Sequence, residues 1–217
     1  MALSFPLATT YFGGLQIKDG RVYLSESLEI NVTGGGEVLS NDLGERLWVG
    51  DVTIAPRPHR IMAAVEAQLS VLRQAGRSFF AFDPRVPAPI SDPTGSILGA
   101  SSPVIASLAV NNRELTISGL PAGYVLSAGD NLSFAYGSAP TRYALHQIVV
   151  GSTANGVGLT GLIEVTPLIR AGASVGASIV LIKPYCKAVY TPGSYQASTG
   201  GQVMSGGLSF SFIQSLR

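Results

Sequence analysis

The chain has 217 residues, which fits one large domain or two small ones and is long enough to bury a hydrophobic core. Its 14 basic and 13 acidic residues nearly cancel, which argues against a broad electrostatic binder of nucleic acid. Charged residues make up only 12% of the chain and hydrophobic residues 46%, so a disordered chain is excluded. A surface this poor in charge predicts that further copies of the chain, or partner proteins, cover much of it.

The single cysteine, Cys186, excludes an intramolecular disulfide and a zinc site built from several cysteines. The segment from Met1 to Tyr11 lacks the cationic and unbroken apolar regions of a signal peptide. No stretch of the sequence is apolar for long enough to span a bilayer. We therefore expect a soluble protein that is made in the cytoplasm and does not associate with membranes.

The first half of the chain predicts short strands, at residues 15–17, 22–24, 28–32 and 47–54, with a glycine loop at 34–36. In the last of these strands Trp48, Val52 and Ile54 share one face of a period-2 pattern. Gly50 interrupts that face, which indicates a bulge or a close approach of backbone.

The segment from about residue 58 to 75 is the only convincing helix. Pro58 suits the first helical turn, and Gly76 suits the position just after the last one. Four apolar residues recur at helical spacing and are expected to be buried against a sheet: Ile61, Val65, Leu69 and Leu72.

The second half begins with five prolines between residues 84 and 103, which predict a long exposed loop or linker. From residue 104 to 183 only strands are expected, at 115–117, 124–126, 132–136, 143–150, 161–165 and 178–182. A strand at 188–190 and a loop at 191–207 precede a last strand, 208–212, in which Leu208, Phe210 and Phe212 alternate with serines. This last strand is expected to pair with the N-terminal half, so that the middle of the chain is an insertion.

These elements together predict an all-β fold with one α-helix. A β-sandwich-like N-terminal domain is expected to comprise residues 1–95 plus 188–217. A small β-barrel or sandwich domain, residues 96–187, is expected to be inserted into it.

Two glycine motifs resemble cofactor or catalytic signatures but are interpreted as turns. The GxGxxG motif at 156–161 is followed by a strand, and no acidic residue comes after Glu164. The GxSxG motif at 172–176 has neither an acid nor a histidine downstream. The only histidines, His59 and His146, have no acid at ligand spacing. We therefore expect no catalytic residue, no cofactor, no metal site and no enzymatic activity.

Aromatic side chains are the strongest remaining signal. They form either an ordinary core or an apolar seam between subunits, and they are Trp48, Phe79, Phe80, Phe82, Phe210 and Phe212. Arginines gather around the predicted helix, either on a solvated face or in polar pairs across an interface: Arg57, Arg60, Arg73, Arg77 and Arg85.

The order of these elements resembles that of the distal tail proteins of long-tailed phages and phage-like particles. In both, a β-rich N-terminal domain carries one helix, here between Trp48 and Phe79, and is followed by a proline-rich exit, an inserted β domain and a returning C-terminal strand. The amino-acid sequence of the middle block also resembles that of β domains in phage virion proteins. The similar segments are Leu120-Pro121-Ala122-Gly123-Tyr124-Val125-Leu126-Ser127-Ala128-Gly129-Asp130, Ala144-Leu145-His146 and Glu164-Val165-Thr166-Pro167.

The resemblance implies a structural virion protein that links the tail tube to the baseplate or tail tip. It implies a homo-oligomeric ring of six copies, whose belt is the N-terminal domain and whose inserted domain faces outward. The implied partners are other copies of the chain and the tail tube and tail hub proteins, with no specific binding of nucleic acid. The implied location is the tail of the virion, after assembly in the host cytoplasm.

Two other interpretations remain open. In the first, the chain is a β-sandwich binding module that contacts host-surface carbohydrate or another tail protein, although the inserted domain lacks the dense aromatic groove typical of sugar binding. In the second, the chain is a hydrolase, for which the sequence offers no plausible triad or pair of acids.

Overall fold

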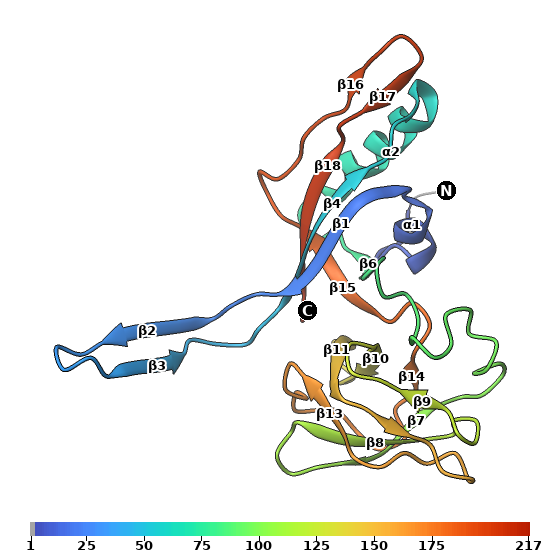
Figure 1. The fold of residues 1–217 in the computed structure, drawn as a ribbon. Helices are drawn as coiled ribbons and strands as arrows, with labels where there is room; N and C mark the ends of the chain where they lie inside the picture. Colours follow the sequence, from blue (N-terminus) through green and yellow to red (C-terminus); the bar gives the residue numbers. More distant parts are fainter. Residues whose placement is uncertain (1–2) are drawn as a thin grey trace.

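The computed structural model describes residues 3–217. It contains a curled half-barrel sheet, drawn in the upper part of Figure 1, and a nearly closed six-stranded barrel below it. A long hairpin projects sideways from the half-barrel. Strands make up 40% of the protein and helices 9%, which confirms the predicted mostly β fold with one substantial helix.

The half-barrel is an antiparallel sheet of five strands in the order β1-β4-β18-β15-β6. These strands are β1 (Ile17–Leu24), β4 (Trp48–Ile54), β18 (Ser209–Gln214), β15 (Tyr185–Tyr190) and β6 (Phe79–Phe82). The C-terminal strand β18 pairs with both β4 and β15, which confirms that the chain returns to its N-terminal half. The pairing of β15 with β6 begins at Tyr185, before residue 188, where the predicted N-terminal domain resumes. The division into residues 1–95 plus 188–217 and residues 96–187 stays a prediction.

Two helices cover one face of the half-barrel: α1 (Thr9–Gly14) and α2 (His59–Leu72). Only the second was predicted, because the six residues of α1 include two glycines and are too few to show a helical period. Phe12 of α1 is fully buried and packs against the rings of Phe79, Phe82 and Phe212. Helix α1 therefore closes the aromatic core.

Helix α2 buries Met62, Val65, Leu69 and Leu72 against the sheet. The prediction that Ile61 is buried was wrong, because its side chain is 47% exposed. Residues four apart share one face of an α-helix, so Ile61 has the same direction as the buried Val65. Ile61 lies in the first turn, and its exposure follows from this place at the end of the helix rather than from its direction.

The barrel is a six-stranded antiparallel sheet in the order β14-β10-β11-β13-β8-β7. Its strands are β7 (Val104–Leu108), β8 (Glu114–Ser118), β10 (Asn131–Tyr136), β11 (Arg142–Val150), β13 (Ile163–Thr166) and β14 (Ile179–Val180). A bridge between Val104 and Ser178 brings the two edges together, so the barrel is nearly closed. Strand β7 was not predicted, whereas the proline-rich segment 84–103 has no helix or strand, as expected.

Short pairs of strands complete the fold. Strand β9 (Val125–Leu126) pairs with β12 (Ser152–Thr153), and β17 (Met204–Gly206) pairs with β16 (Thr199–Gly200) and β5 (Arg57–Pro58). The prediction that residues 191–207 form only a loop was therefore wrong. Strands of two or three residues are too short to show an alternating pattern in the sequence.

The half-barrel and the barrel are joined by specific contacts. The indole Nε1 of Trp48 donates a hydrogen bond of 2.6 Å to the backbone oxygen of Leu145, which lies on β11. The side chain of Leu145 belongs to the core of the half-barrel, unlike its barrel neighbours. Gln214 bridges the same junction, because it accepts a hydrogen bond from the backbone of Trp48 and donates one to Tyr143.

Candidate functional site

The projecting hairpin consists of β2 (Leu28–Val32) and β3 (Val38–Asp42), and every residue of both strands is exposed. We call residues 25–45 the arm. Figure 1 shows it extending away from both helices and from the barrel. A two-stranded hairpin is marginally stable in water when nothing packs against it.

The arm has one apolar face and one polar face. Residues that lie opposite each other in an antiparallel pair share a face, and here Ile30 pairs with Ser40 and Val32 with Val38. The apolar face carries Leu28, Ile30, Val32 and Val38, which are 53%, 59%, 66% and 61% exposed, and ends in Ser40 and Asp42 on the returning strand. Glu29, Asn31 and Asn41 lie on the other face with Leu39. Because nothing in the described chain covers the apolar face, the arm is a candidate interaction element.

Both ends of the arm are structurally defined. At the tip, the backbone N–H of Thr33 donates to the carbonyl of Glu37 over 2.9 Å, and Gly36 adopts a φ of 81° that glycine tolerates best. At the base, Arg170 of the barrel donates to the Glu45 carboxylate over 2.9 Å and to the Arg46 carbonyl over 3.0 Å. The barrel therefore holds the direction of the arm.

The arm is strongly acidic. Five of the 13 acidic residues of the chain and none of its 14 basic residues lie between positions 25 and 45. These acidic residues are Glu26, Glu29, Glu37, Asp42 and Glu45. The rest of the chain consequently carries a net positive charge.

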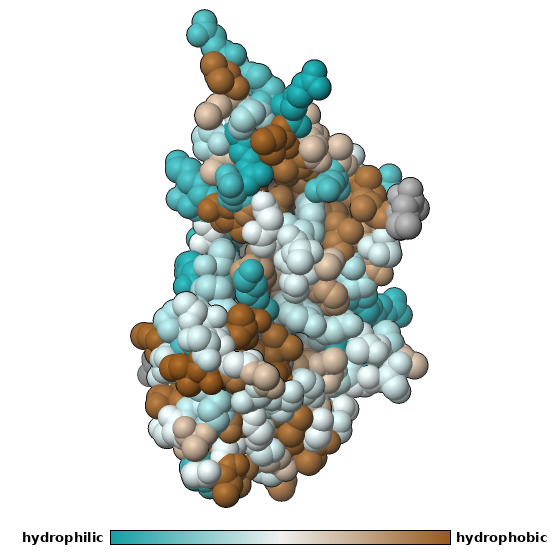
Figure 2. Space-filling model, turned by 90° about the vertical axis from the view of Figure 1, so that its right-hand side faces the viewer, coloured by the Kyte–Doolittle hydropathy of each residue, from teal (hydrophilic) through white to brown (hydrophobic). Residues whose placement is uncertain are grey.

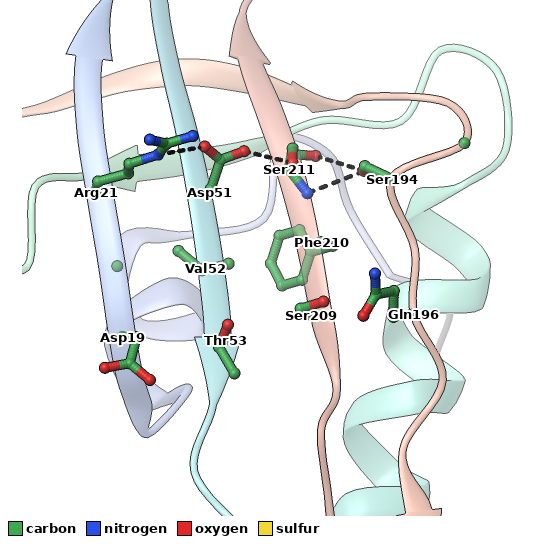
Figure 3. Close-up of a pocket in the computed structure, with 12 residues that line it drawn as sticks. Asp19, Arg21, Asp51, Val52, Thr53, Ser194, Gln196, Ser209, Phe210 and Ser211 are labelled. Carbon is green, nitrogen blue, oxygen red and sulfur yellow. Dashed lines mark hydrogen bonds and ion pairs between the residues drawn. The ribbon is translucent and has the colours of Figure 1, made fainter.

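The open face of the half-barrel, opposite the helices, presents a row of polar side chains (Figure 3). The Arg21 guanidinium donates to Asp51 over 2.7 Å, and the Ser211 hydroxyl donates to the same carboxylate over 2.6 Å. Ser194 in turn accepts a hydrogen bond from the backbone N–H of Ser211. The hydrogen bond from Ser211 and the charge of Arg21 hold the pKa of Asp51 below its ordinary value. Asp51 is thus a charged partner in a hydrogen-bonded row and a poor general base.

A shallow cavity of about 510 Å³ follows this face. Its remaining polar lining comes from Asp19, Thr53, Gln196 and Ser209, which Figure 3 shows along the same three-stranded stretch and the adjoining loop. Most of these groups are neutral hydroxyls and amides. The open face is therefore hydrophilic but carries little net charge.

The six aromatic residues singled out from the sequence lie mostly in the core. Trp48, Phe79, Phe82, Phe210 and Phe212 are each at most 6% exposed, within the half-barrel. Phe80 is half-buried and packs at 4.7 Å from the rings of both Tyr143 and Tyr185, at the junction with the barrel. The structure thus places five of the six in the packed core of a single subunit.

The five arginines near the helix fall into two groups. Arg85 forms an ion pair of 2.8 Å with Asp83, and Arg57 donates weakly to the carbonyl of Gly14 over 3.4 Å. The other three are exposed and have no carboxylate within ion-pair distance among residues 3–217: Arg60, Arg73 and Arg77.

The residues that the sequence offered as candidates for catalysis, cofactor binding or metal binding do not lie together in the structure. His59 lies 2.7 Å from the Ser205 hydroxyl, and His146 is buried on β11 beside the Pro167 carbonyl. Burial raises the pKa of the Cys186 thiol to about 12, which leaves it unreactive near neutral pH. Both glycine motifs lie in loops of the barrel. Within residues 3–217 no group of three or more His, Cys, Asp or Glu residues is placed to hold a metal ion, and neither described helix is long and apolar enough to cross a membrane.

The arm is the feature that sequence reasoning missed in part. The first strand and the glycine loop were expected, but the returning strand Val38–Asp42 was not. Its signal was weak, because residues 38–42 are two adjacent apolar residues followed by three polar ones and show no period-2 alternation.

The surfaces of the half-barrel and of the barrel differ in polarity. Figure 2 shows that most strongly hydrophilic side chains on this face lie in the upper half, whereas the barrel below is covered mainly by weakly polar and hydrophobic residues. Between residues 96 and 187 the chain has only eight charged residues. The low charge noted from the composition is therefore concentrated on the barrel.

Comparison with known proteins identifies no family to which the chain belongs. No protein-family model matches the chain, and no curated protein matches its sequence.

Proposed function

We propose that the protein is a structural component of a phage tail, in which several copies form a ring that links the tail tube to the tail tip. The chain would then act by assembly, with other copies of itself and the neighbouring tail proteins as partners. Its place of action would be the virion tail.

The observation that carries this proposal is the arm. An amphipathic hairpin that projects from a subunit with four apolar side chains more than half exposed needs a protein surface to cover it. In a ring, each copy offers the arm to one neighbour and a different surface to the other, and the set closes if the rotation fits.

The open face of the half-barrel also supports a ring. Its row of hydroxyl and amide groups, with the Arg21 and Asp51 charges paired, would line the lumen of a ring whose helices face outward. A nearly neutral, hydrophilic lining does not bind the phosphate backbone of passing DNA tightly.

The alternative of a carbohydrate-binding module gains no specific support. Sugar recognition relies on exposed aromatic platforms, and the large exposed apolar residues described in the barrel are all aliphatic, such as Val150, Leu162 and Val175.

The test is the mass of the purified protein by size-exclusion chromatography with light scattering, followed by electron microscopy. A ring predicts a discrete species several times heavier than one chain of 22.5 kDa, and class averages with a central hole. A variant in which residues 28–42 are replaced by a short Gly-Ser turn should be monomeric. A full-length protein that stays monomeric at millimolar concentration would refute the proposal.

A further inference from the structure

We propose that the acidic tip of the arm of one copy docks into a basic groove beside the C-terminal end of α2 in a second copy. The inference rests on the proposed function, because it names the surface by which copies of the chain recognise one another.

The groove has the chemistry to receive this tip. It has a volume of about 560 Å³, and its lining includes Leu72, Arg73, Arg77, Val189, Tyr190 and Tyr195. Val189 and the rings of Tyr190 and Tyr195, all partly exposed, supply apolar surface, while the two arginines supply positive charge. The groove is thus matched to a ligand that is apolar and negatively charged at once.

The two arginines are held at the rim but have no carboxylate partner among the described residues. The Arg73 guanidinium lies 4.5 Å from the ring centroid of Tyr195, and that of Arg77 lies 4.5 Å from the ring centroid of Phe5. Stacking on a ring orients a guanidinium and leaves its edge free to bind a carboxylate.

The arm tip has the complementary composition and shape. Glu37 follows the three glycines of the turn, and the apolar pair Val32 and Val38 lies directly behind it. The glycines have no side chains, so the tip is narrow. The Thr33 hydroxyl also accepts a hydrogen bond of 3.1 Å from the backbone N–H of Glu37, which orders the tip before it binds.

The occupant has to come from another molecule. Figure 1 shows the arm pointing away from α2, and the contact of Arg170 with Glu45 and Arg46 fixes the base of the arm in that direction. At about 3.3 Å per residue, the arm reaches roughly 30 Å from its base, which is enough to cross onto a neighbour.

The charge distribution favours a second copy of this chain as the occupant. The arm carries only acidic charges, whereas the remainder of the chain has 14 basic and eight acidic residues. Such a division of charge within one chain steers identical copies into a head-to-tail contact and disfavours contacts between two arms.

A charge exchange tests the contact in the full-length protein. Glu37→Arg and Arg77→Glu, taken singly, should each raise the concentration at which half of the chains are assembled by about tenfold or more. The double variant Glu37→Arg/Arg77→Glu should return it to within a few-fold of the original value. Glu26→Arg is the matched control, since it makes the same change at the base of the arm and should alter assembly by less than about twofold.

Cross-linking tests the position directly. Gly35→Cys at the tip and Gln74→Cys at the groove, made in separate chains and mixed under mild oxidation, should give a disulfide-linked dimer. Gly35→Cys mixed with Gly156→Cys in the barrel should give none, and the buried Cys186 does not interfere.

The outcomes separate this inference from the proposed function. Assembly of the unchanged protein, together with no link between positions 35 and 74 or no rescue by the double variant, would overturn the docking site and leave the ring proposal intact. Failure of the unchanged protein to assemble, together with no cross-link between the Gly35→Cys and Gln74→Cys variants, would overturn both.

Discussion

Gly50 lies in the middle of β4, with the ring of Phe212 packed over its α-carbon. A Cβ atom placed at Gly50 would overlap this ring. The pairing of β1 with β4 runs without a break at Gly50, and its only irregularity lies between Ile17 and Asp19. Of the two expectations from the sequence, the bulge is therefore wrong, and the group that approaches Gly50 is the Phe212 side chain rather than backbone.

We predict that Gly50→Ala lowers the free energy of unfolding by about 1–3 kcal/mol, because Phe212 is fully buried and has no room to move aside. Chemical denaturation followed by circular dichroism measures this change. Gly156→Ala is the control, since nothing lies within 4 Å of a Cβ there. Equal stability of the two variants would contradict the packing described.

His146 predicts a pH dependence of stability. Burial lowers its pKa from 6.5 to about 4, although the Pro167 carbonyl opposes this shift. Between these values the unfolded chain binds more protons than the folded one, so stability falls as the pH falls from about 6.5 to 4. The expected loss from this group is roughly 3 kcal/mol at the acidic end.

The measurement is the urea midpoint at several pH values, with His146→Gln as the comparison. Glutamine keeps a hydrogen-bond donor near the Pro167 carbonyl but does not titrate. The variant should therefore lose stability less steeply than the original protein across this range. Identical slopes would show that His146 does not titrate in this way.

At the scale of elements, α2 shows that a periodic sequence pattern predicts where a helix lies but not which of its apolar residues are buried. The pattern located the helix correctly, but it could not show that Met62 is buried and that Ile61, in the first turn, stays exposed. The apolar arc is wide enough to include both residues, and only the sheet decides which part of it is covered.

This difference gives a matched pair of variants. Leu69→Ala should destabilise the protein by about 2–5 kcal/mol, because Leu69 is fully buried. Ile61→Ala on the same helix should change stability by less than about 1 kcal/mol in the monomer, because Ile61 is 47% exposed. Thermal unfolding of both variants compares them, and a large loss from Ile61→Ala would mean that this side chain is covered in solution.

At the scale of the whole molecule, the contacts of Trp48 hold the half-barrel and the barrel together. Trp48 is the only tryptophan of the sequence and is 4% exposed. Its indole donates a hydrogen bond to the backbone of the barrel. Trp48→Phe leaves the Leu145 carbonyl without this donor and removes part of the packed ring.

We predict that Trp48→Phe lowers stability by about 1–3 kcal/mol and increases hydrogen exchange along β11. Exchange read by mass spectrometry gives the position of the change, and Tyr23→Phe, on an exposed aromatic residue, is the control. Unchanged exchange along β11 would mean that the junction does not depend on Trp48.

The sequence by itself determined the class of the fold, the main helix, the proline-rich loop and the return of the last strand to the first sheet. These features follow from local periodicity, turn residues and the alternation of Phe210 and Phe212 with serines, which are properties of neighbouring residues. Only the tertiary structure decided which side chains remain exposed. The alternation of Leu28, Ile30 and Val32 is the same whether a strand lies in a sheet or projects from it. The exposed arm and the pairing of Arg170 with Glu45 depend on residues far apart in the chain, so no local pattern predicts them.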